Sequence, residues 1–254
     1  MRRLARMVQI AAMLILPSGM AHSDAIRVLS VGAVQNVLTA LAAEFSKETG
    51  HTVDLAIAAP AALTQKIKAG DVRDAVIVSE GAMDQLDGEG MVNPESRVAL
   101  ARTGLGVAVR ESAPSPDLST PEAFKQALLA AQSIVYGDPT LANQSGAKAE
   151  QVLKKAGLFE TLRPKLRIVP GGAASREMIA KGEVEMGLYN AVEIAEGKGV
   201  KVAGVVPAPW QIDTRYEAAV MSDGSAPEAA RAFILFLSRP EAGAKWRAAK
   251  FAPP

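Results

Sequence analysis

The chain contains no cysteine among its 254 residues. This absence excludes disulfides, thiolate metal sites and a cysteine nucleophile, so the stability of the fold must come from packing alone. Histidine is also scarce, with His22 at the end of an N-terminal leader and His51 in a loop after a helix. Neither is placed to act as the base of a serine nucleophile, and no HExxH or Gly-x-Ser-x-Gly pattern occurs. We therefore expect no catalytic residue, no metal site and no cofactor, and a protein that is not an enzyme.

Beyond its first residues the chain has no apolar segment long enough to cross a membrane. The first residues have a basic start, a short apolar run and a small-residue cleavage site, formed by Arg2, Arg3, Arg6, residues 8–16 and residues 19–21. These features predict a secretory signal over residues 1–21, with cleavage as late as residue 25 as an alternative. A membrane anchor is the competing interpretation, but Pro17 interrupts the run, which is much shorter than the roughly 20 residues of a span. We expect the mature protein to be exported.

An excess of basic residues is absent too. The chain has 28 basic and 27 acidic residues, and removal of the three signal arginines leaves 25 basic ones, a formal balance of −2. No basic field is therefore available to hold nucleic acid, and we expect no such partner. The mature chain of about 230 residues is long enough for one large domain or for two lobes of roughly a hundred residues each.

Repeated strand, loop and helix patterns open the mature chain. Apolar, β-branched runs at residues 26–31, 53–57 and 75–79 alternate with segments whose apolar residues follow helical spacing. This order is typical of a mostly parallel sheet with helices on its faces, an α/β fold. Ligands of such sheets bind at the loops that leave the carboxyl ends of the strands. The loops that follow these three strands, at Gly32, Ala59 and Ser79, are therefore candidate walls of a site.

A long extended segment at residues 98–109 and the proline-rich residues 207–210 interrupt this order. Each is suited to carry the chain from one lobe into another, so we predict two lobes with a ligand cleft between them. The predicted boundaries place the first lobe at 24–101 plus 215–254, the second lobe at 105–207, and the crossings at 102–104 and 208–214. A single doubly wound domain is the alternative that the pattern leaves open.

The segment from Ile134 to Leu158 predicts an anion site. An apolar strand leads through Gly137-Asp138-Pro139 and the polar residues Asn143-Gln144-Ser145-Gly146 into an alanine- and lysine-rich helix. The first turn of a helix has unpaired N–H donors and the positive end of the peptide dipole, so it suits a small anion. The alternative is that Ser145 merely caps the helix.

Four local patterns, in this order along the chain, carry a resemblance to a known family. They are the first strand-turn-helix unit, Lys68-Ala69-Gly70-Asp71 before residues 75–79, Gly137-Asp138-Pro139 before a helix, and Gly199-Val200-Lys201-Val202. Over nearly the whole mature chain the sequence resembles the periplasmic molybdate-binding proteins of ABC importers. The resemblance implies a type II periplasmic-binding-protein fold that closes on its ligand by hinge motion. It also implies a periplasmic monomer that captures a molybdate- or tungstate-like oxyanion and presents it to a membrane permease.

The resemblance also implies a set of ligand-binding positions, in which the family uses serines, backbone amides and a tyrosine. The first-lobe positions, where the family has serines, are occupied here by Ala33, with Val34 next to it, and by the loop Ala59-Pro60-Ala61. The second-lobe positions are Asn143, Ser145, Gly146, Gly172, Ala173, and Tyr189 or Asn190.

These replacements leave a second ligand class open. A dianion needs most of its oxygens paired, because each missing hydrogen bond to a charged group costs about 1.5–3 kcal/mol. The apolar wall of the first lobe would instead suit a small organic carboxylate, with Arg102 in the crossing segment as a bidentate partner. Arg102 and Arg176 have surface roles as their alternative interpretation. An exported enzyme that uses carboxylates in the same cleft is a third hypothesis.

Overall fold

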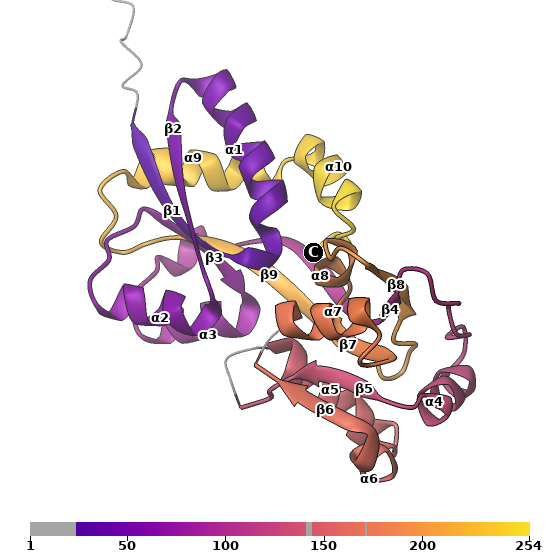
Figure 1. The fold of residues 1–254 in the computed structure, drawn as a ribbon. Coiled ribbons are helices and arrows are strands. Elements are labelled where there is room, and N and C mark those ends of the chain that lie inside the picture. Colours follow the sequence, from indigo (N-terminus) through magenta and orange to yellow (C-terminus); the bar gives the residue numbers. More distant parts are fainter. Residues whose placement is uncertain (1–23, 141–143, 171) are drawn as a thin grey trace, which may run out of the picture.

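The computed structural model describes residues 24–140, 144–170 and 172–254 of the chain (Figure 1). The predicted signal at residues 1–21 and the candidate Asn143 lie outside these residues. Strand β4 (Val98–Arg110) joins two groups of strands. The first group, in the spatial order β2-β1-β3-β9, consists of β2 (Thr52–Ala58), β1 (Ala25–Val31), β3 (Ala75–Ser79) and β9 (Asp213–Val220). The second consists of β7 (Met186–Asn190), β5 (Ile134–Gly137), β6 (Leu166–Val169) and β8 (Val200–Val205).

Helices cover both groups. The helices of the first lobe are α1 (Gln35–Thr49), α2 (Pro60–Lys68), α3 (Glu80–Gly88), α9 (Pro227–Ser238) and α10 (Pro240–Ala248). Those of the second lobe are α4 (Pro121–Ala130), α5 (Gln144–Lys155), α6 (Phe159–Leu162), α7 (Gly172–Lys181) and α8 (Ala191–Ala195). Figure 1 shows that the indigo start and the yellow end of the described chain share the first lobe. None of the helices in the described residues is both long and apolar enough to cross a membrane.

Strand β4 is the connection that creates the two lobes. Its residues 98–104 pair antiparallel with β9, and its residues 105–110 pair antiparallel with β7 and β8. In the first lobe β1 pairs parallel with β2 and β3, and in the second lobe β5 pairs parallel with β6 and β7. The predicted two-lobed α/β fold is therefore confirmed. We retain the predicted residue boundaries of the lobes as a proposal.

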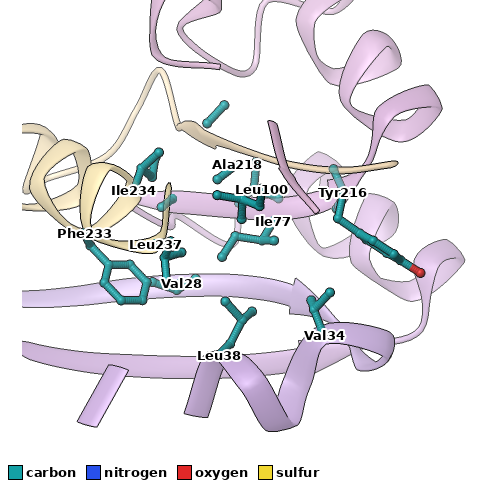
Figure 2. Close-up of a cluster of buried hydrophobic side chains, with 14 of the residues drawn as sticks. Val28, Val34, Leu38, Ile77, Leu100, Tyr216, Ala218, Phe233, Ile234 and Leu237 are labelled. Carbon is teal, nitrogen blue, oxygen red and sulfur yellow. The ribbon is translucent and has the colours of Figure 1, made fainter. Parts of the chain in front are cut away.

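Each lobe has its own hydrophobic core. The first-lobe core brings buried side chains from its strands together with those from α1 and α9, among them Val28, Leu38, Ile77 and Phe233 (Figure 2). In the second lobe the buried apolar residues form two further clusters on either side of the sheet, one with Phe124 and one with Ile179. Separate cores allow the lobes to keep their structure while the angle between them changes.

The short helix α8 lies between the lobes. Its Val192 packs in the first-lobe core, whereas its Ile194 packs in the second-lobe cluster that contains Ile179. One residue beyond α8, Glu196 Oε1 accepts a hydrogen bond of 2.9 Å from Asn36 Nδ2 on α1. Residues on α8 are therefore held where the two lobes meet.

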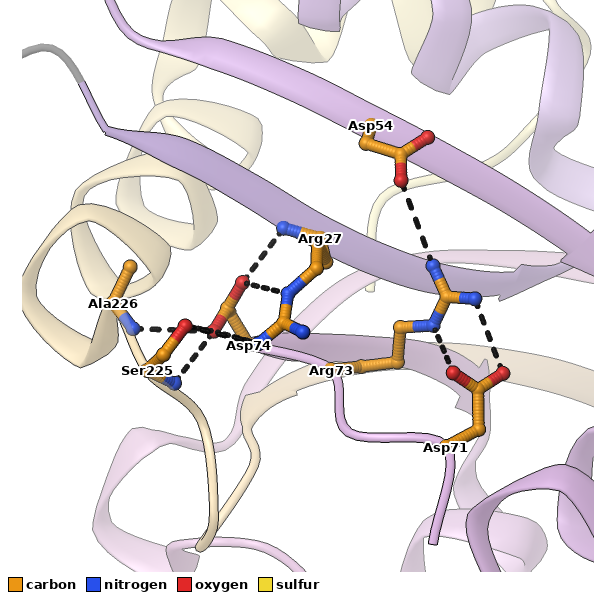
Figure 3. Close-up of polar contacts among 7 residues, drawn as sticks. All are labelled: Arg27, Asp54, Asp71, Arg73, Asp74, Ser225 and Ala226. Atoms are coloured by element: carbon orange, nitrogen blue, oxygen red, sulfur yellow. Dashed lines mark hydrogen bonds and ion pairs between the residues drawn. The ribbon is translucent and has the colours of Figure 1, made fainter.

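A polar network ties the amino end of β3 to the start of α9 (Figure 3). The Asp74 side chain is fully buried and accepts hydrogen bonds from the backbone N–H groups of Arg27 (2.8 Å), Ser225 (2.7 Å) and Ala226 (3.1 Å). The Arg27 guanidinium adds two contacts of 3.3 Å to the same carboxylate. The network lies at the amino end of the parallel strands, opposite the end at which ligands of such sheets bind, so we assign it a structural role.

Candidate functional site

The predicted anion loop of the second lobe leads into the first turn of α5. The helix begins at Gln144, so Ser145 lies inside its first turn and does not occupy the capping position considered from the sequence. Its side chain is buried, with 1% exposed. A Cβ atom on Gly146 would stand 2.2 Å from the Gly137 carbonyl oxygen, so only glycine allows this turn to pack directly on the end of β5. Gly146 is thus explained by close packing of backbone against backbone.

The facing positions of the first lobe are apolar. Ala33 and Val34 form a 3₁₀ turn after β1, and the Val34 side chain is fully buried in the first-lobe core. A ligand could therefore contact Val34 only through its backbone. Ala59 and Pro60 are exposed at the start of α2, and the side chain of Ala61 lies outside the described part of the structure. Proline at the first position of α2 also lacks the N–H that another residue would offer there.

The two arginines considered from the sequence, Arg102 and Arg176, have different surroundings in the structure. Arg102 Nη1 pairs with Asp213 Oδ2 at 2.5 Å, and its Nε donates to the Pro253 carbonyl at 3.0 Å. The Arg102 guanidinium is therefore engaged at the crossing between the lobes. Arg176 is half-buried on α7, and its Nη1 stands 3.3 Å from the place that a Cβ on Gly172 would take. Arg176 thus lies beside the N-terminus of α7, where Gly172 and the exposed Ala173 are predicted to bind ligand.

Tyr189 and Asn190, at the end of β7, have different surroundings. The Tyr189 side chain is fully buried, and its hydroxyl stands 2.3 Å from the place of a Cβ on Gly187. Burial raises the pKa of Tyr189 above its usual range, while the nearby Ser175 side chain on α7 acts in the opposite direction. The Tyr189 hydroxyl thus points beneath α7. Asn190 is 4% exposed, and its Oδ1 accepts a hydrogen bond of 3.1 Å from the Thr214 hydroxyl.

Glu193 on α8 is a candidate site residue that the sequence reasoning missed. Its side chain is half-buried, and its Oε1 accepts a hydrogen bond of 2.8 Å from Asn190 Nδ2. Its Oε2 stands 3.0 Å from the place of a Cβ on Gly172, so the carboxylate lies against the first residue of α7. Burial raises the pKa of Glu193, the Asn190 hydrogen bond and the Arg176 charge lower it, and Glu196 raises it. A titratable carboxylate therefore lies beside the predicted anion site.

Lys148 on α5 is a second missed residue. Its Nζ donates hydrogen bonds of 2.6 Å to the Asp213 carbonyl and to the Thr214 hydroxyl, which links α5 to the start of β9. Burial lowers the pKa of Lys148 to about 8, against the opposing charges of Asp213 and Glu80. The sequence feature that could have identified Lys148 is its position three residues after Ser145, because residues three apart lie on the same face of a helix. Glu193 has the same kind of signal, three residues after Asn190.

Tyr216 on β9 is a buried tyrosine of the first-lobe core. Figure 2 shows its ring leaving the hydrophobic cluster with the hydroxyl at the far end. Burial raises the pKa of Tyr216, and the charges of Glu193 and Glu196 raise it further. Within residues 24–140, 144–170 and 172–254 no group of three or more acidic or histidine side chains could hold a metal ion. The site therefore offers helix N-termini, two cationic side chains and one half-buried carboxylate.

Comparisons with known proteins agree with this architecture. The family described as bacterial extracellular solute-binding protein matches residues 26–251. The aconitate isomerase of a Pseudomonas species is 32% identical over 221 residues, which cover 85% of this chain and 82% of that protein. The molybdate-binding protein ModA of Escherichia coli (strain K12) is 25% identical over 89% of this chain and 88% of its own length.

A solved structure shows the same fold. The periplasmic molybdate-binding protein of Azotobacter vinelandii superimposes with a TM-score of 0.72 over 90% of this chain and 99% of that one, at 22% sequence identity. At this identity the likeness concerns the fold alone. The predicted type II periplasmic-binding-protein fold and the resemblance to molybdate-binding proteins are both confirmed, whereas the prediction that the protein is not an enzyme is not.

Proposed function

Because this chain belongs to the bacterial extracellular solute-binding protein family, we propose that it captures a small organic polycarboxylate between its two lobes. The observation that carries the proposal is the placement of Arg176 beside the N-terminus of α7. A guanidinium next to the N–H groups at a helix N-terminus matches a carboxylate, which it can hold through two parallel hydrogen bonds. The apolar first-lobe positions Ala33, Ala59 and Pro60 then face the carbon skeleton of the ligand.

The relative named aconitate isomerase supports this ligand class, because aconitate is a small unsaturated tricarboxylate. Lys148 supplies a second cationic group near the hinge, at the N-terminal part of α5. We further propose that the chain is exported by residues 1–21, acts in the periplasm as a monomer, and presents its ligand to the membrane permease of an ABC importer. Of the residues predicted from the sequence, Ser145, Gly146, Gly172, Ala173 and Asn190 form the second-lobe side of this proposed site.

A thermal-shift panel tests the ligand class. The mature chain is heated with cis- and trans-aconitate, citrate, tricarballylate, molybdate, tungstate and sulfate. A ligand at a hundred times its Kd stabilises a protein by about 2.7 kcal/mol. In a chain of this size that corresponds to a rise of about 5–10 °C in Tm. We expect this rise with tricarboxylates, and stabilisation by the oxyanions alone would overturn the proposal.

Arg176→Met tests the residue on which the proposal rests. Loss of charge-assisted hydrogen bonds worth about 1.5–3 kcal/mol should weaken carboxylate binding about 10- to 100-fold in calorimetric titration. Arg163→Met is the matched control, because the Arg163 side chain is 74% exposed and pairs only with the exposed Glu160 among the described residues. Equal affinity of the two variants would remove Arg176 from the site.

Oxyanion capture is the second candidate, favoured by the relatives named molybdate-binding protein. It makes a separate prediction at the first-lobe positions. Ala33→Ser combined with Ala59→Ser restores hydroxyl groups where the family resemblance places serines, so molybdate affinity should rise in this variant. The original chain could instead bind molybdate tightly, with an affinity that the added hydroxyls do not change. In that case other groups donate the hydrogen bonds, and oxyanion capture is the preferred function.

A further inference from the structure

Capture of a polycarboxylate leaves Glu193 without a function. A carboxylate at the N-terminus of α7 repels an anionic ligand and competes with it for the same N–H groups. Solute binding alone would favour a neutral donor at this position. Glu193 nevertheless stands against Gly172 and is half-buried where the two lobes meet.

A chain of hydrogen bonds holds the Glu193 carboxylate in a fixed orientation. Lys148 Nζ donates to the Thr214 hydroxyl (2.6 Å), Thr214 donates to Asn190 Oδ1 (3.1 Å), and Asn190 Nδ2 donates to Glu193 Oε1 (2.8 Å). The four residues come from α5, β9, the end of β7 and α8, so elements from distant parts of the chain hold one oxygen in place. The other oxygen, Oε2, is the one that faces Gly172 and the N-terminus of α7.

Chemically, Glu193 has the properties of a proton-transfer group. An oriented carboxylate can take a proton from carbon when the negative charge that forms is stabilised nearby. Arg176 and the N–H groups at the start of α7 are placed beside the same carboxylate and supply that stabilisation. Burial raises the pKa of Glu193, which makes its ionised form a stronger base than an exposed glutamate.

We propose that Glu193 is a catalytic residue that moves a proton between two carbons of a bound unsaturated polycarboxylate, and this rests on the proposed function. The Glu193 carboxylate takes a proton from the methylene carbon next to the double bond. The C–H electron pair forms a new double bond to that methylene carbon, and the old double bond shifts its electrons onto the far carbon and its carboxylate. Glu193 then returns the proton to the far carbon. One C–H bond breaks and one forms, so the step needs no further reactant and leaves Glu193 ionised.

In this step Arg176 binds the substrate carboxylate that accumulates negative charge. The apolar wall at Ala33 and Ala59 faces the reacting carbons from the first-lobe side and limits the water around them. In the isomerisation step Asn190, Thr214 and Lys148 serve as positioning residues, because their hydrogen bonds orient the Glu193 carboxylate. The proposal thus gives the fold of a binding protein the activity of an isomerase through the chemistry of the Glu193 side chain.

Hydrogen exchange into the ligand tests the proposal directly. The mature chain is incubated in D₂O with cis- or trans-aconitate, and NMR follows deuterium at the methylene and vinyl carbons together with interconversion of the isomers. We expect exchange and interconversion with the original chain, and a fall of about 10²- to 10⁴-fold in Glu193→Gln, the range typical of a lost general base. Calorimetric titration of the same samples should show that Glu193→Gln still binds the ligand.

Glu196→Gln is the matched control. Glu196 lies three residues further on, is exposed, and hydrogen-bonds to Asn36, so its loss should leave exchange nearly unchanged. Glu193→Asp keeps a carboxylate that is shorter by one methylene, and it should retain slow exchange even if the glutamine variant folds poorly. Binding without exchange in the original chain would overturn the proposal and leave the proposed function intact. If tricarboxylates do not bind, both fail.

The positioning role of Thr214 has its own readout. Thr214→Val removes the hydroxyl that links Lys148 to Asn190, so kcat for interconversion should fall about tenfold with KM little changed. Thr214→Ser restores the hydroxyl and should restore kcat. A change confined to KM, or no rescue by serine, would show that the hydrogen-bond chain does not position Glu193.

Discussion

Replacement of Asp74 by alanine should remove a large share of the stability of the first lobe (Figure 3). Asp74 is fully buried and accepts hydrogen bonds from the backbone N–H groups of Arg27, Ser225 and Ala226 as well as from the Arg27 guanidinium. Alanine would leave three backbone donors and one arginine without this partner. Each buried donor without a partner costs about 1–3 kcal/mol, and breaking a buried ion pair costs about 3–5 kcal/mol in all.

Because the Arg27 side chain is 36% exposed, water can take over part of its hydrogen bonding, so we expect a loss near the lower limit, about 3 kcal/mol. Asp74→Asn keeps the shape and one acceptor oxygen but loses the charge. This variant should lose roughly half as much unfolding free energy as Asp74→Ala. Its remaining oxygen still accepts hydrogen bonds, whereas its NH₂ group is a donor and cannot accept the bonds that the second carboxylate oxygen accepted.

The dependence on pH follows from the same contacts. Burial raises the pKa of Asp74, but the hydrogen bonds from Arg27, Ser225 and Ala226 outweigh it and lower the pKa to about 2. A carboxylate whose pKa is depressed in the folded state stabilises the fold above its unfolded pKa of 3.8 and loses that contribution as pH falls through the folded value. The shift corresponds to about 2 kcal/mol. The stability difference between the original chain and Asp74→Asn should therefore narrow between about pH 4 and pH 2.

Urea unfolding followed by circular dichroism, at pH 7 and at steps down to pH 2, measures both effects. Asp54→Asn is the control. The Asp54 side chain is 69% exposed, and its ion pair with Arg73 is long, at 3.7 Å. This substitution should therefore change the free energy of unfolding by less than about 0.5 kcal/mol. An Asp74→Ala variant as stable as this control would refute the reasoning. A difference for Asp74→Asn that stays constant with pH would refute the ionic part alone.

Two further predictions concern helix α5. Gly146→Ala places a Cβ atom 2.2 Å from the Gly137 carbonyl oxygen, so it should lower the free energy of unfolding by about 3 kcal/mol in urea titration. Gly88→Ala, where nothing lies within 4 Å, should be neutral or stabilising, and equal effects of the two variants would contradict the packing argument. Burial lowers the pKa of Lys148 from 10.5 to about 8. Between these two pH values the unfolded chain binds more protons than the folded chain, so the free energy of unfolding rises with pH in this range. Lys148→Met should lack this rise when unfolding is compared at pH 7.5 and pH 9.5.

The sequence was sufficient to predict the fold because the fold depends on local patterns. Each of these patterns predicts only the structure of the residues that form it. Examples are the β-branched runs, the helix end near Gly50 and the extended segment at residues 98–109. The first-lobe candidates Ala33 and Ala59 lie at the loops where the alternation of strands and helices places them. Parallel strands put their carboxyl ends at one edge, so positions at that edge can be listed before the structure is known.

The chemistry of the site depends on contacts between residues that are far apart in the chain. Lys148 meets Thr214 across 66 residues, and Thr214 meets Asn190 across 24. No periodicity marks these pairs, so the sequence did not show that Lys148 and Glu193 belong to one network. The sequence also left open whether Ser145 caps the helix or belongs to an anion site, and only the structure shows that the first turn of α5 buries its side chain.

In the proposed site, the charge of Glu193 discriminates between classes of anion. Helix N-termini attract any anion, because their donors are backbone N–H groups that do not depend on the side chain. A charged side chain beside them then decides between ligands. One unit charge about 4 Å from the Glu193 carboxylate costs about 4 kcal/mol at an effective dielectric constant of 20, so a compact dianion there costs about 8 kcal/mol. That equals the whole binding free energy of a ligand with a Kd of about 1 μM. A polycarboxylate spreads its charges over several ångströms, so only one of them needs to lie near Glu193, and Arg176 beside it offsets that single charge.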